Sequence, residues 1–126
     1  MPWELDGERP IYTQLLEQLQ RRIIAGVYQA GHRLPSVRDL AQEAAVNANT
    51  MQRALTELEQ AGLVHAQRTA GRFITEDQAM IAAARATFAL RHAHTYLSGM
   101  KKLGYTREQS LALLQEAETP AVTDEQ

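Results

Sequence analysis

The sequence predicts a mainly α-helical chain that carries one small β-hairpin. Two helical patterns in the first half of the 126 residues are joined by a tight turn, and two short β-like runs follow around a loop that contains glycine. A long alanine-rich helical pattern and a shorter one occupy the rest of the chain. This order predicts an N-terminal winged helix-turn-helix followed by a C-terminal two-helix dimerisation segment.

The first helix follows an N-terminal arm at residues 1–8. Pro10 suits the start of a helix, where its missing N–H and fixed φ do no harm. Apolar residues then recur at helical spacing, at Tyr12, Leu15, Leu16, Leu19 and Ile23. Gly26 is a suitable residue to end this helix, and we expect a loop over residues 27–35, which contain glycine and proline.

The second and third helices have recognisable starts. Ser36 and Asp39 form an N-cap pair that begins a short second helix. A turn at residues 45–47 follows, and Asn47 can cap a third helix that ends near Ala61. The inner face of this third helix is apolar, with Met51, Ala54, Leu55 and Leu58. Two helices joined by a tight turn can place the second helix in the major groove of DNA.

The β-like runs complete the first domain. Residues 63–67 and 72–75 flank a loop at residues 68–71 and are expected to form a hairpin. The winged helix-turn-helix domain is therefore expected over residues 9–76. Arginines bracket the hairpin tip, at Arg68 and Arg72, and arginine is favoured where such a tip enters a minor groove.

The second half is expected to be a helical dimerisation domain at residues 77–118, with a flexible tail at residues 119–126. Its last helix starts after Thr106, which forms a capping box with Gln109. The long helix carries a broad face of small apolar side chains, which packing against a second copy would bury. The predicted dimer interface consists of Ala82, Ala86, Phe88, Ala89, Ala93, Tyr96, Leu97 and Met100. The alternative is that this face folds back onto its own winged domain.

Several polar side chains of the helix-turn-helix suit contacts with DNA. The amides of Asn49 and Gln52 can bond adenine, and Arg53 can meet guanine or a phosphate. Thr50 can bond a phosphate or touch a thymine methyl group, and Arg38 can reach the DNA backbone or a guanine. The N-termini of both helices also offer free N–H groups to phosphate.

Three stretches carry a more specific signal: LPSVRDLA at residues 34–41, VNANTMQRAL at residues 46–55 and LEQAGLV at residues 58–64. In this order they resemble the winged-helix domain of the GntR family of transcription regulators. The motif at residues 10–15, the long first helix and the short two-helix tail resemble the YtrA-like branch of that family. The YtrA-like resemblance covers nearly the whole chain.

The resemblance implies a homodimer that binds a pseudo-palindromic operator in double-stranded DNA, usually as a repressor, often of its own operon and of a neighbouring transporter operon. It implies DNA contacts at Ser36, Arg38, Asn47, Ala48, Asn49, Thr50, Gln52 and Arg53, and in the wing at Arg68, Gly71 and Arg72. The C-terminal part of the YtrA-like branch is too short for the ligand pocket of larger relatives and mainly dimerises. Two alternatives stay open for an effector: a small molecule at the dimer interface, or none.

Two positions depart from the family pattern. The family wing commonly reads Arg-x-Gly-x-Gly-Thr-Phe-Val, whereas this chain has RTAGRFI at residues 68–74. One glycine is lost and Arg72 stands where threonine is usual, which leaves the shape of the wing tip open. Ala48 stands where the family often has Arg or Pro, so one contact to a base or a phosphate is missing.

Composition and motifs argue against other classes of protein. The formal net charge of −2 disfavours binding through bulk positive charge, but it leaves room for a local basic surface. With no cysteine, and with four histidines that lack ligand spacing, we expect neither a metal nor another cofactor. The pattern contains no signal peptide and no membrane span, so we expect a soluble cytoplasmic protein without membrane partners.

Two other functions compete with DNA binding. An enzyme is not indicated, because the sequence has no nucleophile–base arrangement, phosphate loop or paired carboxylates. A winged helix that binds another protein instead of DNA is the alternative function. Such a module would more often show an apolar outer face on the third helix, whereas this one carries Asn49, Gln52, Arg53 and Thr56.

Overall fold

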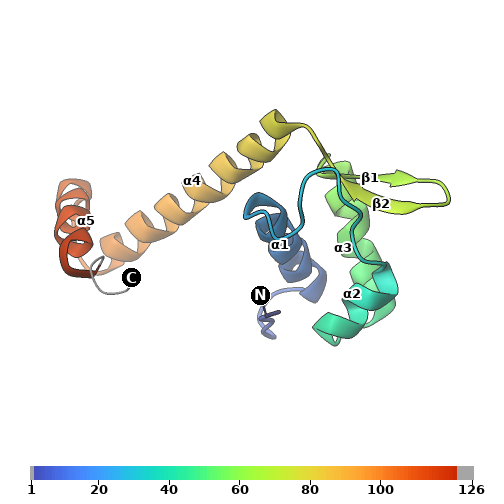
Figure 1. Ribbon diagram of the computed structural model, residues 1–126. Helices are drawn as coiled ribbons and strands as arrows, with labels where there is room; N and C mark the ends of the chain where they lie inside the picture. The colour runs from blue at the N-terminus through green and yellow to red at the C-terminus, as the bar shows by residue number, and fades with distance from the viewer. Residues whose placement is uncertain (1, 122–126) are drawn as a thin grey trace. The chain divides into compact units, whose positions relative to one another are not determined.

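The computed structural model describes residues 2–121, with side chains described as far as residue 117. The elements within this range are α1 (Ile11–Ile24), α2 (Val37–Ala44), α3 (Ala48–Gln60), β1 (Val64–Gln67), β2 (Gly71–Ile74), α4 (Gln78–Lys102) and α5 (Arg107–Ala121) (Figure 1). They occur in the predicted order, so the mainly helical fold class with one antiparallel hairpin is confirmed.

The chain divides into two compact units, the first ending at Ala86 and the second beginning at Thr87. The first unit therefore includes the opening turns of α4, beyond the expected domain end at residue 76. This extension has a packing reason, because Ile81 is buried in the core of the first unit and Ala84 packs against it.

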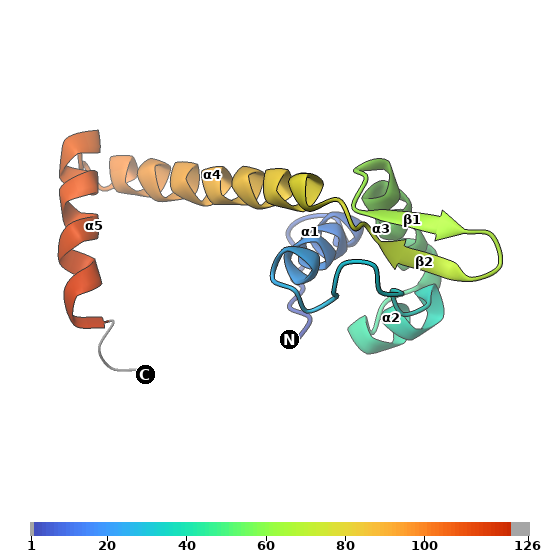
Figure 2. The same ribbon diagram turned by 45° about the horizontal axis from the view of Figure 1, so that its top comes forward.

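The core of the first unit is built around α3, which contacts α1, α2 and β1 (Figures 1 and 2). The inner stripe of α3 is fully buried, with Met51, Ala54, Leu55 and Leu58 each 0% exposed. Residues of the neighbouring elements complete this core: Leu15, Leu19, Leu40, Leu63, Val64 and Ile74. Burial of each large apolar side chain contributes about 1.5–3 kcal/mol. Because one side of α3 is held in this way, its other side faces solvent.

Side chains begin α2 and α3 as the sequence predicts. Ser36 Oγ accepts a hydrogen bond from the Asp39 N–H at 3.1 Å, and Asn47 Oδ1 accepts one from the Asn49 N–H at 2.7 Å. Each cap satisfies a backbone N–H that has no partner inside its helix, which contributes about 1 kcal/mol. Both predicted N-caps are confirmed.

The turn between α2 and α3 places Ala45 in the left-handed region, with a φ of +59°. This conformation costs roughly 1–2 kcal/mol in a residue that has a Cβ atom. Backbone hydrogen bonds hold it, because the Val46 N–H donates to Ala41 O at 3.0 Å and the Ala45 N–H donates to Gln42 O at 3.2 Å. The chain thus reverses within a few residues and starts α3 close to the end of α2.

The two strands of the hairpin pair antiparallel, with Val64 opposite Ile74 and Gln67 opposite Gly71. Residues 68–70 form the loop between them, and the Ala70 N–H donates to Gln67 O at 3.0 Å. The hairpin therefore ends in a tight three-residue wing tip, although this chain lacks one glycine of the family wing pattern.

Residues 31–34, which we name the edge segment, lie along the other side of β2. The Leu34 N–H donates to Arg72 O at 2.8 Å, and two further backbone hydrogen bonds join the segment to Ile74, at 2.9 and 3.0 Å. Residues 27–35 contain no helix or regular strand, as predicted, but the second half of this loop is hydrogen-bonded to β2. These hydrogen bonds join residues about forty positions apart, which is why the sequence did not reveal them.

The N-terminal arm is docked on α1 by two glutamine side chains. Gln14 Nε2 donates to Asp6 O and to Arg9 O, both at 2.9 Å, and Gln14 Oε1 accepts from the Asp6 N–H at 2.9 Å. One turn further along, the Gln18 amide pairs with the backbone N–H and C=O of Glu4, at 3.2 and 2.6 Å. Two glutamine side chains of α1 thus hold the backbone of the arm by five hydrogen bonds.

Side chains also fasten the arm. The Arg22 guanidinium lies 3.8 Å from the centre of the Trp3 ring, and its Nη1 donates to Tyr28 Oη at 3.0 Å. At the other end of the arm, Glu17 accepts hydrogen bonds from the Arg9 guanidinium and raises the pKa of Arg9 above its ordinary value. Trp3 and Arg22 therefore cover one end of the first unit's core.

Both helices of the C-terminal half start at side-chain caps. Asp77 Oδ1 accepts from the Ala79 N–H at 3.0 Å at the start of α4. Gly104, with a φ of +94°, ends that helix. Thr106 and Gln109 then form the predicted capping box, in which each side chain accepts from the other's backbone N–H, at 3.1 and 2.9 Å. No helix within residues 2–121 is long and apolar enough to cross a membrane.

Inside the second unit, Tyr96 Oη donates to Ser110 O at 2.7 Å and joins α4 to α5. The helix α5 continues to Ala121, three residues past the expected end at residue 118. The rest of the expected flexible tail, residues 122–126, lies outside the described residues.

We predict that Gln14→Ala releases the arm from α1. The variant loses three hydrogen bonds of a side chain that is only 3% exposed, so the free energy of unfolding should fall by about 1–3 kcal/mol. Trp3 is the only tryptophan, so its fluorescence should shift to longer wavelength as the ring becomes exposed. Gln20→Ala, on the same helix, is the control. Unchanged emission and stability in Gln14→Ala would show that the arm does not depend on this side chain.

Candidate nucleic-acid interface

The outer face of α3 is polar along its first two turns. Asn49, Gln52, Arg53 and Thr56 are exposed, whereas Thr50 is half-buried. Gln52 Nε2 lies 3.4 Å from Thr56 Oγ1, a long contact that leaves the amide free to turn toward a ligand. This face therefore offers amide and hydroxyl groups, which are the chemistry that reads base edges.

The start of α2 and the start of α3 are exposed together with their caps. Ser36, Arg38, Asn47 and Ala48 all reach solvent. Because Asn47 Oδ1 already caps α3, its amide nitrogen is the group left for an outside partner. Helix N-termini carry partial positive charge and spare N–H groups, so both starts suit a phosphate. Ala48 offers only a methyl group and its backbone.

Arg53 is exposed but held on both sides. Its guanidinium carbon lies 3.7 Å from the centre of the Tyr12 ring, and its Nε lies 3.9 Å from Glu57 Oε2. The first contact joins α3 to α1, and the second runs along α3 itself. Arg53 is therefore preorganised at the edge of the α3 face rather than projecting freely from it.

The wing tip is exposed along residues 68–70, and Arg68 lies there without a described acidic partner. Gly71 follows with a φ of +104°, a conformation that favours glycine. This geometry defines the shape of the wing tip, which the altered wing sequence had left open. The tip keeps its charge and a tight turn, and Gly71 supplies the one glycine that the backbone needs.

Arg72 is not at the tip. It stands opposite Ala66 in the hairpin, and its side chain is only 20% exposed. Its Nε lies 3.7 Å from Glu59 Oε1 of α3. The structure therefore separates Arg72 from the other predicted wing residues and directs it back toward α3.

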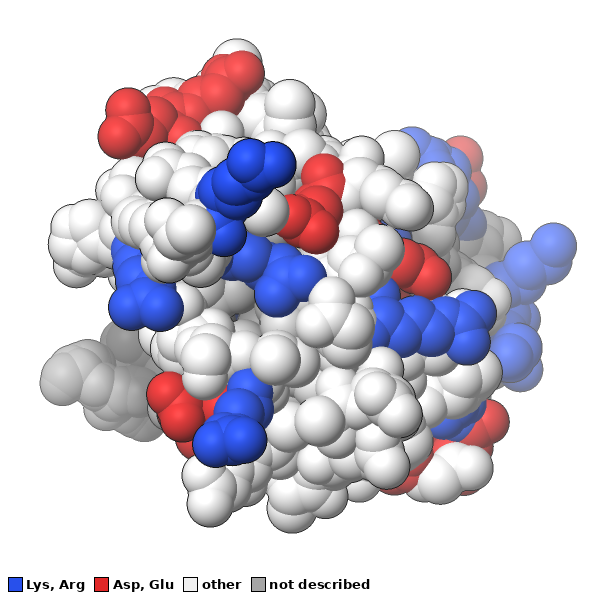
Figure 3. All heavy atoms as spheres, turned by 90° about the vertical axis from the view of Figure 1, so that its right-hand side faces the viewer, with Lys and Arg blue, Asp and Glu red and all other residues white. Residues whose placement is uncertain are grey.

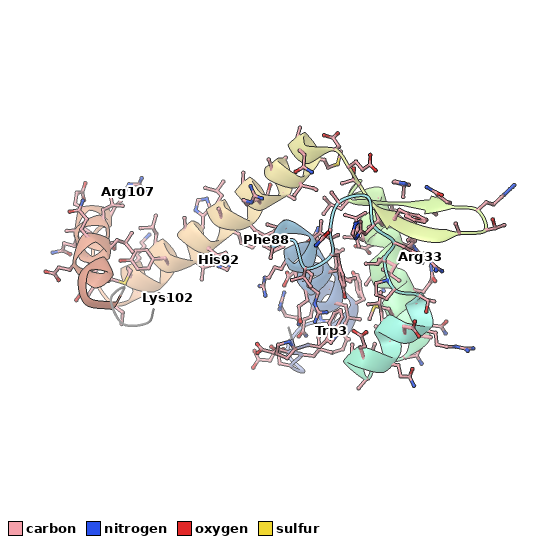
Figure 4. The ribbon with its side chains drawn as sticks, in the orientation of Figure 1. Trp3, Arg33, Phe88, His92, Lys102 and Arg107 are labelled. Atoms are coloured by element: carbon pink, nitrogen blue, oxygen red, sulfur yellow. The ribbon has the colours of Figure 1, made fainter. Side chains whose placement is uncertain are left out.

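Arg33 was not among the predicted site residues, although it lies beside them. It belongs to the edge segment, is exposed, and forms a bridge with Phe73 of β2. Figure 4 shows Arg33 below the wing strands, on the side where α2 lies. The sequence around Arg33 is typical of a loop. Its position beside the wing would have been found only by predicting that the edge segment pairs with β2.

Figure 3 views the unit from the end that carries the wing and α2. Arginine side chains spread across this face, and carboxylates lie between them. Cations and carboxylates therefore lie side by side on this face, in a chain whose formal net charge is −2. Among the described residues, no three His, Asp or Glu side chains are placed to hold a metal ion.

Comparisons with known proteins agree with this geometry. Residues 11–74 match the model of the bacterial regulatory proteins of the gntR family. The chain is 32% identical over 108 residues to the uncharacterized HTH-type transcriptional regulator YhcF of Bacillus subtilis, covering 86% of this chain and 89% of that one. It is 38% identical over 68 residues to the HTH-type transcriptional repressor YtrA of the same organism, covering 54% and 52% of the two chains. Among solved structures, a GntR family transcriptional regulator from Listeria monocytogenes has a TM-score of 0.82 at 35% identity, covering 89% of this chain and 98% of that one.

Proposed function

Because the chain belongs to the gntR family of bacterial regulatory proteins, we propose that it is a homodimeric repressor that binds a pseudo-palindromic operator. Family membership makes it a DNA-binding transcription regulator and not an enzyme. The observation that carries the proposal further is the polar outer face of α3, flanked by two exposed helix starts. In this proposal α3 enters the major groove, and the starts of α2 and α3 hold phosphates.

The proposed base contacts come from Asn49 and Gln52, and the proposed backbone contacts from Ser36, Arg38 and Thr50. Arg53, steadied by Tyr12, reaches a guanine or a phosphate at the edge of the same groove. Asn47 and Ala48 approach the DNA through backbone and small groups at the start of α3. Arg68 enters the minor groove from the wing tip. For Arg72 the burial and the Glu59 contact favour a supporting role in the wing.

Repression is proposed from two supports. A relative that is 38% identical over 68 residues carries the printed name of a transcriptional repressor. A dimer seated on an operator also blocks polymerase by occupying the promoter. The proposed targets are the chain's own operon and a linked transporter operon, and the proposed place of action is the cytoplasm.

The proposed homodimer rests on the exposed apolar surface of the second unit. Five large side chains there are between 41% and 72% exposed: Leu90, Leu103, Tyr105, Leu111 and Leu114. A soluble chain rarely leaves so many large apolar groups in water without a partner. Four alanines of the predicted interface are also exposed, at Ala82, Ala86, Ala89 and Ala93. Tyr96, Leu97 and Met100 are half-buried and can add to this surface, whereas Phe88 is already buried within its own chain.

We predict that the protein lowers transcription from its own promoter. Purified protein, polymerase and a template that carries the DNA upstream of its own gene should give less transcript as the protein concentration rises. A template with an unrelated promoter is the control. A rise in transcript would replace repression with activation, and no effect on this template would remove autoregulation from the proposal.

We predict that Arg38→Ala and Arg53→Ala each weaken binding to a duplex that the protein selects, by about 1–3 kcal/mol, or roughly tenfold to a hundredfold. Both side chains are exposed, so both variants should stay folded, although Arg53→Ala also loses the contact with Tyr12 and should melt at a slightly lower temperature. Arg21→Ala is the matched control, because Arg21 lies nine residues after Tyr12 and thus on the opposite side of α1. Fluorescence anisotropy measures the affinities. Unchanged affinity in both variants would reject this contact assignment.

We predict that Ala93→Glu breaks the dimer. A carboxylate placed in an apolar interface stays unpaired there, which is costly. Light scattering should then report a mass near the 14.1 kDa of one chain rather than twice that value. The affinity for the operator should fall as the dimer is lost. Ser98→Glu, on the polar face of the same helix, should leave the dimer intact. A dimer that survives Ala93→Glu would place the interface elsewhere.

A further inference from the structure

The arginines around the proposed DNA-binding face fall into two groups. Arg53 and Arg72 each lie within 4 Å of a glutamate of α3, at 3.9 and 3.7 Å. Arg33, Arg38 and Arg68 have no carboxylate of the described residues within ion-pair distance. A guanidinium that already faces a carboxylate gains less from a phosphate, because the existing pair has to be weakened first. The second group therefore contains the cations that are ready to bind phosphate.

Arg33 differs from the other two because its backbone forms an isolated bridge with strand β2. It forms a bridge with Phe73, and the next residue, Leu34, donates its N–H to Arg72 O at 2.8 Å. The backbone that carries the side chain is thus tied to β2 by hydrogen bonds of the residues on both sides of Arg33. A cation on a rigid support loses less conformational entropy when it binds than one on a flexible loop.

The Arg33 guanidinium lies directly over Gly71. A Cβ atom placed on Gly71 would be 2.9 Å from Arg33 Nε and 3.3 Å from its Nη2. Any side chain at residue 71 would therefore push the guanidinium away from the base of the wing. Glycine at this position serves the positive φ of +104° and also leaves the space that Arg33 occupies.

We propose that Arg33 is a further DNA-contact residue, a phosphate-binding cation seated on Gly71 at the base of the wing. This rests on the proposed function, in which α3 lies in the major groove and the wing lies over the adjacent backbone. Arg33 lies below the wing strands, on the side of α2 (Figure 4), and in the proposed docking this side would face a phosphate of that backbone. Its fork of N–H donors is always charged and suits phosphate oxygens. A phosphate contact positions the protein and does not select a base sequence.

The salt dependence of binding tests this assignment in the full-length protein. Affinities of the unchanged protein, Arg33→Ala, Arg33→Lys and the Arg21→Ala control are measured on a selected duplex and on an unrelated duplex, over a range of salt concentrations. In Arg33→Ala the slope of log K against log salt should become shallower by about 0.9, the value for one phosphate. Affinity should fall by a similar factor, on the order of tenfold, on both duplexes. Arg33→Lys should keep the slope, and Arg21→Ala should behave as the unchanged protein.

A second variant tests whether the position of the Arg33 guanidinium over Gly71 matters for binding. Gly71→Ala should make the slope shallower as Arg33→Ala does, and the double variant should lose little more than either single change. Circular dichroism and the melting temperature identify any variant that fails to fold, and Arg33→Ala alone then decides. An unchanged slope in a folded Arg33→Ala that still binds DNA would overturn the Arg33 assignment and leave the proposed function standing. Failure of the unchanged protein to bind either duplex would overturn both.

Discussion

The buried apolar stripe on the inner face of α3 is the constraint on which the rest of the first unit depends. Met51, Ala54, Leu55 and Leu58 are completely buried against α1, α2 and β1. The helix cannot rotate without exposing these side chains, and each such exposure costs a few kcal/mol. The polar outer face is therefore presented in one orientation, and a recognition helix needs this property because base readout tolerates little rotation. The caps at Ser36 and Asn47 fix the helix starts on either side of the turn.

The placement of individual arginines matters more for this molecule than its net charge. The formal net charge is −2, yet several arginine side chains lie on the face with the wing and α2 (Figure 3). Glutamates of α3 hold two of them, Arg53 and Arg72, close to the protein. Arg33, Arg38 and Arg68 have no carboxylate of the described residues within ion-pair distance, so their charge is available to an outside partner. Such an arrangement limits nonspecific attraction to nucleic acid and leaves affinity dependent on a few placed cations.

Local signals in the sequence were sufficient for the elements. Caps, glycine ends and the apolar stripe of α3 are written in residues a few positions apart, and all of them predicted the structure correctly. Contacts between distant residues could not be predicted in this way. The edge segment pairs with β2 across about forty residues of sequence, so Arg33 was missed. The positions of Arg53 and Arg72 depend on Tyr12, Glu57 and Glu59, none of which the DNA-binding pattern includes.

The central claim is that α3 reads a specific DNA sequence, twice, from a symmetric dimer. Selection of binding sites from a random duplex library, with the full-length protein at near-physiological salt, tests it most directly. The account predicts enrichment of an inverted repeat, whose half-site spacing reports the geometry of the dimer. Enrichment of nothing, with only weak and salt-sensitive binding, would contradict the claim and would favour a winged helix that binds another protein.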